Sequence, residues 1–321
     1  MKRLLMIVLI CLSPHLFSQN NNGKADDFGR ISLTTYIPDQ VEGLTPSAHN
    51  VLSSKLSQIA TLNGLGGNGF DQRFILTANV NVLSKDITPT APPMQAYTLE
   101  ITLYVGDGID GTLFASHAVT LKGVGENEAK AYNAALKNLK TNSPDYQEFL
   151  SQGKLRIIEY YNSRCDFIIK QAQALESQGN YEAAIFNLML VPEVCADCYG
   201  KCMDLVGVIY QKMIDHDCKR LLAEANNAWN AGQDGNAANN ASEYLSQIDP
   251  QSVCFEDALD LSDRIAKRVR ELDQREWNFE MKKYQDNVDS RNAIIKAARD
   301  VGVAFGNNQP KSVVKNIRGW F

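Results

Sequence analysis

The residues best suited to chemistry in this sequence are cysteines, six of which lie between positions 165 and 254. In a protein exported to an oxidising compartment, an even number of cysteines predicts disulfide bonds. Cys165 and Cys218 each begin the first helix of an expected helical hairpin, and Cys195 and Cys254 each follow the proline that ends the second helix. Because these two ends of a hairpin lie close together, we predict the pairs Cys165–Cys195 and Cys218–Cys254. Each bond would close a loop of about 30–37 residues and contribute about 3–4 kcal/mol.

Two further cysteines, Cys198 and Cys202, are left without an obvious partner. They are four residues apart on an expected helix, so they share one face at a Cα separation of about 6 Å, which is within bridging range. Exchange of partners with Cys195 is a second option. Two alternatives need free thiols instead: zinc bound by Cys195, Cys198, Cys202 and His216, or a redox-active Cys195-x-x-Cys198 motif.

Other catalytic signals are few. The four histidines, His15, His49, His117 and His216, are scattered, and the sequence has no G-x-S-x-G, H-E-x-x-H or Walker string. The glycines in GDGIDG at 106–111 spell G-x-G-x-x-G, but they join two expected strands rather than opening a helix, so they predict a hairpin turn and not a nucleotide site. We therefore predict a protein that is not an enzyme and has no cofactor or metal.

The first 18 residues have the order of a secretory signal. Lys2 and Arg3 precede an apolar run at residues 4–12, and Ser13-Pro14 follows it. The run is shorter than the roughly 20 residues that span a bilayer, so we expect cleavage after residue 18 and no transmembrane segment in the mature chain. Residues 19–29 then form a flexible linker. Lipidation of Cys11 is left open, although Ile10 is larger than the small residue that a lipobox places before the cysteine.

The composition indicates a soluble globular protein with two domains. The chain has 321 residues, of which 44% are hydrophobic and 21% are charged. These fractions exclude a disordered tail and a polytopic membrane protein. The formal net charge of −5 becomes more negative when the basic signal is removed, which argues against nucleic acid as a partner.

Residues 30–142 are expected to form an α/β domain in the order β-α-β-β-β-α. Thr45-Pro46 provides a helix N-cap and a proline at the first helical position, and the apolar residues after it have helical spacing. Four runs alternate apolar and polar residues as strands do. The predicted fold is a small mixed β-sheet with two helices on one face, and its expected strands are residues 30–38, 73–83, 97–105 and 112–122.

Residues 150–305 are expected to form an all-α domain with an internal repeat. Cys165, Ala172 and Gly179 recur as Cys218, Ala225 and Gly232, at a constant offset of 53 positions. Such self-similarity predicts stacked helical hairpins. A third helix, at 198–215, would be inserted between the two copies, and one long helix would run from 256 to 305. The tail, 306–321, is basic and aromatic, and we expect it to dock on this same molecule, with docking on a partner as the alternative.

The first copy resembles a tetratricopeptide repeat. Gly179, Tyr181 and Ala184 form a G-x-Y-x-x-A arrangement at the junction of two helices, and Pro192 ends the second helix. The second copy keeps the glycine, the alanine and a proline but lacks the tyrosine. The resemblance covers about 90 residues and implies an extended surface for binding peptides or protein elements.

The first domain resembles the small α/β domain of the CsgG, TolB N-terminal and LPP20-like envelope proteins. The shared features are the helix led by Thr-Pro and a long hairpin that ends in Gly123, Gly125, Glu128 and Ala129 at a helix start. Those families act mostly in assembly, secretion or binding at the cell envelope. No functional residue is carried over from them.

These features together predict an α+β protein that is exported to the periplasm or outer membrane of a Gram-negative-type bacterium. We expect a non-catalytic interaction scaffold, or an assembly or secretion accessory, that binds other envelope proteins or peptides, with peripheral association with the outer membrane as an option. Tyr181, Tyr199 and Trp229 are its candidate partner-binding residues. The alternatives are a metal-binding or thiol-redox protein that uses Cys195, Cys198 and Cys202, and a glycan- or peptidoglycan-binding module with a pocket near residues 88–96.

Overall fold

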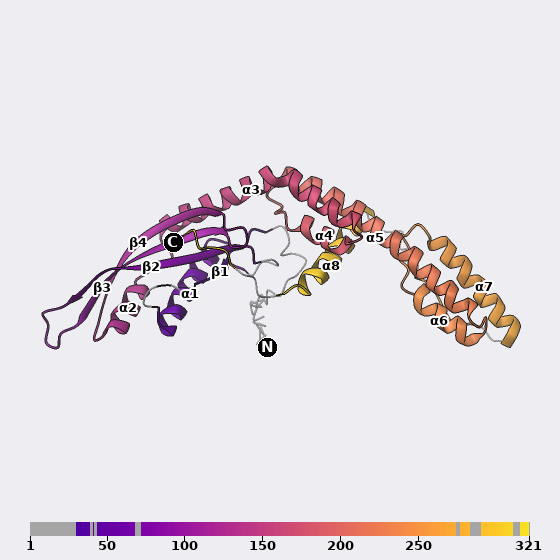
Figure 1. The fold of residues 1–321 in the computed structure, drawn as a ribbon, viewed down its shortest axis with the longest axis horizontal. Coiled ribbons are helices and arrows are strands. Elements are labelled where there is room, and N and C mark those ends of the chain that lie inside the picture. Colours follow the sequence, from indigo (N-terminus) through magenta and orange to yellow (C-terminus); the bar gives the residue numbers. More distant parts are fainter. Residues whose placement is uncertain are drawn as a thin grey trace, which may run out of the picture.

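The computed structural model describes residues 30–38, 41, 44–67, 72–273, 277–282, 290–310 and 315–320. Within these residues the chain has an α+β fold with a four-stranded mixed sheet and eight helices. The expected signal (1–18) and linker (19–29) lie outside the described residues. Figure 1 shows an arch with the sheet at one end and the helices α6 (Gly235–Leu245) and α7 (Phe255–Asp273) at the other. No helix in the described part of the chain is both long and apolar enough to cross a bilayer.

The sheet has the strand order β1-β2-β3-β4, with β1 parallel to β2 and the other pairs antiparallel. The predicted first strand, residues 30–38, shrinks to a two-residue β1. β2 instead extends four residues beyond its prediction, because Ser84–Ile87 pair with the start of β3 although their side chains are mostly exposed. The strands are β1 (Thr34–Thr35), β2 (Phe74–Ile87), β3 (Gln95–Asp107) and β4 (Leu113–Gly125).

One face of the sheet is covered by α1 (Pro46–Leu62), α2 (Glu128–Lys137) and the first half of α3 (Pro144–Ser177). The Thr45 side chain accepts a hydrogen bond from the Ala48 amide at 3.2 Å, which is the N-cap that the sequence predicted. Alternate residues of β3 point into this layer and are fully buried against the helices, which is the burial that stabilises the domain. They are Leu99, Ile101, Leu103 and Val105.

Two glycines at the end of β4 let α2 pack directly on the strand. A Cβ atom on Gly123 would lie 2.1 Å from the Ala135 amide nitrogen, and one on Gly125 would lie 2.4 Å from that of Ala131. Backbone contacts this close leave no space for a side chain. The Gly123 and Gly125 pattern in the sequence therefore sets the distance between sheet and helix.

The remaining helices form two hairpins and a returning segment. α3 turns at Gly179, whose φ is +77°, into α4, and α5 turns near Gln233 into α6. The expected separate helices at 198–215 and from 218 onward are one continuous α5, because residues 215–218 contain neither glycine nor proline to end it. The bounds are α4 (Tyr181–Met189), α5 (Ala196–Asn230), α6 (Gly235–Leu245), α7 (Phe255–Asp273) and α8 (Ser290–Asn307).

The prediction of a single long helix from 256 to 305 is wrong. α7 ends at Asp273, and residues 277–282 are not helical. Trp277, Phe279 and Met281 are partly buried while the residues between them are exposed. This period of two fits extended chain and not a helix. α8 then returns to pack on α4, where Phe186 and Phe305 have ring centroids 5.4 Å apart.

The apolar interior is divided into two large cores. The first core runs from the sheet through α3 and α4 to the first half of α5, and it includes Ala298 of α8. The distal core lies between the second half of α5, α6 and α7. α3 passes without a break through the boundary expected at 142–150, so one helix belongs to both the sheet layer and the helical hairpins.

Candidate functional site

The described part of the chain contains two disulfides, one at each predicted hairpin. The predicted bond Cys218–Cys254 is present and joins α5 to the start of α7, with a Cα separation of 6.0 Å. The predicted bond Cys165–Cys195 is wrong, because Cys165 pairs with Cys198 instead. Cys195 is the N-cap residue of α5, and its Sγ lies 4.0 Å from the carbonyl oxygen of Ile158, which is two turns before Cys165 on α3.

Three sulfur atoms meet at the junction of α3 and α5. The Sγ atoms of Cys165, Cys198 and Cys202 all lie within 4.8 Å of one another, and all three residues are buried. Cys202 and Cys195 are free thiols, so the optional Cys198–Cys202 bond is not formed. Burial raises the pKa of both thiols, to about 11 for Cys202. Both thiols are therefore protonated, and poor nucleophiles, at neutral pH.

The ligand set expected for zinc is not brought together. His216 lies 14 positions beyond Cys202 on the same straight helix, which corresponds to about 21 Å. Its side chain is exposed and its ring lies beside Tyr181, with ring centroids 5.8 Å apart. The sulfur atoms that do converge include Cys165 and not Cys195.

The three aromatic residues proposed as exposed contacts have different environments. Trp229 is only 8% exposed and belongs to the distal core, so it is a core residue and not a surface anchor. Tyr181 and Tyr199 are half-buried. The Tyr199 hydroxyl accepts a hydrogen bond from Arg299 of α8 at 2.7 Å. Of the three, Tyr181 is the one whose ring faces a surface side chain, His216.

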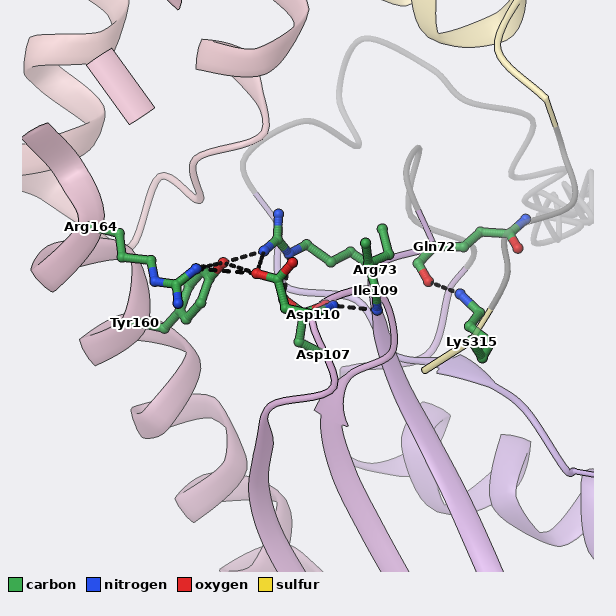
Figure 2. A network of polar contacts seen from close by, with 8 residues as sticks. All are labelled: Gln72, Arg73, Asp107, Ile109, Asp110, Tyr160, Arg164 and Lys315. Carbon is green, nitrogen blue, oxygen red and sulfur yellow. Dashed lines mark hydrogen bonds and ion pairs between the residues drawn. The ribbon is translucent and has the colours of Figure 1, made fainter. Parts of the chain in front are cut away.

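A connected polar site lies at the β3–β4 turn, which the sequence did not single out for this purpose (Figure 2). Asp107 is fully buried, and its Oδ1 accepts hydrogen bonds from the amides of Ile109 at 2.9 Å and Asp110 at 3.0 Å. Its Oδ2 accepts from Arg73 Nε at 2.6 Å. Asp107 therefore shapes the turn and anchors β2 to it.

The outer side of this turn contacts α3. Asp110 Oδ2 accepts from Arg73 at 2.6 Å, from Arg164 at 3.1 Å and from the Tyr160 hydroxyl at 3.0 Å. Arg73 and Arg164 also lie over the Tyr160 ring, with guanidinium carbons 5.2 and 4.5 Å from its centroid. Such cation–π contacts add to the ion pairs. The network joins the sheet to the long helix.

Two groups of this network, Arg73 and Tyr160, have a raised pKa. Burial alone would lower the pKa of Arg73, but the carboxylates of Asp107 and Asp110 outweigh it and raise the pKa. Burial raises the pKa of Tyr160, although the nearby Arg73 charge opposes the rise, and the hydrogen bond to Asp110 adds to it. Neither group changes charge near neutral pH. The arrangement therefore suits positioning of two elements more than proton transfer.

A segment from the far end of the chain covers the opposite side of the same turn. Asn316 donates its amide to the Gly108 carbonyl at 2.6 Å, and Trp320 Nε1 donates to the Gly111 carbonyl at 2.8 Å. Lys315 Nζ donates to the Gln72 carbonyl (Figure 2). The predicted docking of the tail on this molecule is thus confirmed for residues 315–320.

A cavity of about 580 Å³ lies between the end of α1 and the start of α3. Its polar lining includes Asn63, Asn142, Ser143 and Gln147. It is not at residues 88–96, where the glycan-binding alternative placed a pocket.

Comparisons with protein-family models, with curated proteins and with solved structures found no match to this chain.

Proposed function

We propose that this is an exported, non-catalytic scaffold protein of a Gram-negative-type cell envelope. It would bind other envelope proteins or peptides and so assist their assembly or secretion. Its place would be the periplasm, with peripheral association with the outer membrane as an option. The observation that carries the proposal is the arch of helical hairpins built on two unbroken helices, α3 and α5 (Figure 1). Extended helical arrays present long surfaces to proteins and peptides.

Local geometry at the first hairpin supports the resemblance to tetratricopeptide repeats. Gly179 has the positive φ that lets the chain reverse, and Ala184 is completely buried where α4 meets α3. A small residue at that point permits close approach of the two helices. Tyr181 lies at the start of α4 and is only partly buried, so part of its ring is available to a partner.

The rigidity of the arch favours a binding role. α3 has 34 residues and so spans about 50 Å. The Asp110 network fixes the middle of α3 to the sheet through Tyr160 and Arg164, and the Cys165–Cys198 bond fixes the same part of α3 to α5. A preorganised surface of this kind loses little conformational freedom when a partner binds.

The test begins with export of the full sequence in a Gram-negative host. We expect a mature mass that begins at Gln19 and recovery from the periplasmic or outer-membrane fraction. A photo-reactive residue is then placed at position 167, since Phe167 is 63% exposed on α3, and at position 83 on the sheet as a comparison. Discrete adducts at 167 that weaken in a Tyr181→Ala variant but not in Tyr181→Phe would support the scaffold. Retention in the cytoplasm, or no saturable adduct at either position, would refute it.

The sulfur cluster supports a second candidate, a buried metal or thiol-redox site. Cys165, Cys198 and Cys202 could supply three thiolates to a thiophilic ion if the Cys165–Cys198 bond were reduced. Intact-mass measurement of the exported protein after alkylation without reductant, together with metal analysis, separates the two candidates. Stoichiometric metal and three or more alkylated cysteines would favour the second candidate. Two intact disulfides without metal would favour the scaffold.

A further inference from the structure

Glycines line the surface on which residues 315–320 lie. A Cβ atom on Gly106 would lie 2.5 Å from the Trp320 ring, and one on Gly108 would lie 2.9 Å from Lys315 Cδ. The same atom on Gly111 would lie 2.8 Å from the Asn316 carbonyl oxygen. We call Gly106, Gly108 and Gly111, with the flanking residues Ile75 and Tyr104, the glycine platform.

The hairpin itself explains Gly111 and part of the need for glycine at Gly106, where an added Cβ would lie 2.6 Å from the Thr112 carbonyl oxygen. Gly111 has a φ of +75°, which favours glycine for conformational reasons. Gly106 and Gly108 do not have a positive φ. At Gly108 the nearest atoms to an added Cβ belong to Lys315 and Ile75. The closest approach at this position is therefore made by the covering segment, through the flexible Lys315 side chain.

All the contacts of the docked segment come from six consecutive residues. Ile317 and Trp320 are buried at 6% and 7% exposure, in a small cluster with Ile75 and Tyr104. The segment also makes a main-chain hydrogen bond to Gly108 and a side-chain bond to Gly111. Two apolar anchors plus bonds to a backbone edge are the features by which proteins recognise short linear peptides.

We propose that the glycine platform is a peptide-binding site for a partner segment with the pattern Lys-x-Ile-x-x-Trp, and that residues 315–320 are its internal competitor. The aliphatic residue and the tryptophan fill the positions of Ile317 and Trp320, and the lysine reaches the Gln72 carbonyl. This inference rests on the proposed function only for the identity of the partner, an envelope protein. Binding of a peptide to the glycine platform can be measured with the purified chain alone.

Competition within one chain sets the affinity that a partner needs. A tethered segment acts at an effective concentration of about millimolar. A free peptide with the same contacts therefore binds the wild-type chain weakly, while removal of one internal anchor frees the platform. A natural partner would need further contacts, for example with β4 or α3, to displace the internal segment.

The experiment uses the full chain with Trp320→Ala and a fluorescently labelled peptide of sequence KNIRGW, read by fluorescence anisotropy. We expect saturable binding to Trp320→Ala that is at least ten-fold tighter than binding to the wild type. Adding Tyr104→Ala or Gly108→Val to that variant should weaken binding at least ten-fold. Adding Phe167→Ala, which removes an aromatic ring remote from the platform, should leave binding unchanged. Circular dichroism checks the fold of each variant.

Three results would overturn the inference. They are no saturable binding by a folded Trp320→Ala chain, equal binding of a KNIRGA peptide, and equal binding by wild type and variant. If Trp320→Ala loses its helical signal, Ile317→Ala serves as the milder release of the same segment. Peptide binding without any crosslinked envelope partner would support the glycine platform and refute the scaffold. A crosslinked partner without peptide binding would support the scaffold and refute the glycine platform.

Discussion

Replacing Asp107 by alanine should strongly lower the free energy of unfolding of the first core. The side chain is fully buried and accepts one hydrogen bond from Arg73 and two from turn amides. All three bonds are made to the charged carboxylate, and such a bond contributes about 1.5–3 kcal/mol. Arg73 keeps Asp110 as a partner, so no unpaired charge is left. The lower ends of the three contributions predict a loss of about 4–5 kcal/mol.

The amide replacement separates the two contributions. Asp107→Asn keeps a carbonyl oxygen for the turn amides but loses the charge that faces Arg73, so we expect a loss of about 2 kcal/mol. Asp217→Ala is the control, because Asp217 pairs with Arg220 at the surface. Its loss should stay below about 0.5 kcal/mol.

Urea unfolding measures these values if the two cores are observed separately. The chain has three tryptophans, and only Trp320 lies at the sheet. A background with Trp229→Phe and Trp277→Phe therefore reports the first core through Trp320 fluorescence. A loss under 0.5 kcal/mol for Asp107→Ala, or equal losses for alanine and asparagine, would refute the argument that the buried carboxylate organises the turn.

Four further outcomes are expected. Replacing Cys218 and Cys254 by serine should lower the stability of the distal core by about 3–4 kcal/mol, given a sequence separation of 36, and leave the sheet transition in place; calorimetry measures both. Trp229→Ala should cost the same core about 3–5 kcal/mol, and a loss under 1 kcal/mol would contradict its buried position. Gly123→Ala should destabilise the first core by about 1–3 kcal/mol and raise hydrogen exchange in α2, because its Cβ would meet the α2 backbone. Burial favours the protonated Cys202 thiol and raises its pKa to about 11, so the stability that this protonated form gives is present at neutral pH and is lost as the pH rises through that value. Alkylation followed by mass spectrometry should show slow labelling of Cys202 at pH 8 that accelerates with pH. Labelling at pH 8 as fast as that of an exposed cysteine would contradict this prediction.

Local signals in the sequence predicted local structure well. Thr45-Pro46 predicted the start of α1, and the GDGIDG string predicted the hairpin turn between β3 and β4, because the relevant contacts lie within a few residues. Cys218–Cys254 followed from hairpin geometry alone. The predicted bond Cys165–Cys195 was wrong by one helical turn, because Cys165 pairs with Cys198. The sequence did not show that Cys195 precedes α5 and faces an earlier turn of α3.

Long-range contacts could not be predicted in the same way. Arg73 and Tyr160 are 87 positions apart, and no local pattern links them. Tyr160 and Arg164 do have the i, i+4 spacing that places two side chains on one helix face, which was a usable signal. The alternation in WNFEMK was a second one, since it has the period of extended chain within a segment that otherwise reads as helix.

The contact between Lys315 and Gln72 also constrains the order of events as the chain folds. These residues are 243 positions apart. If the chain is exported N-terminus first, as proposed, Gln72 and the four strands emerge before residues 315–320, so the sheet can fold while the glycine platform is still bare. Each newly exported molecule then passes once through an open state, in which this surface is offered to any matching peptide before its own segment docks.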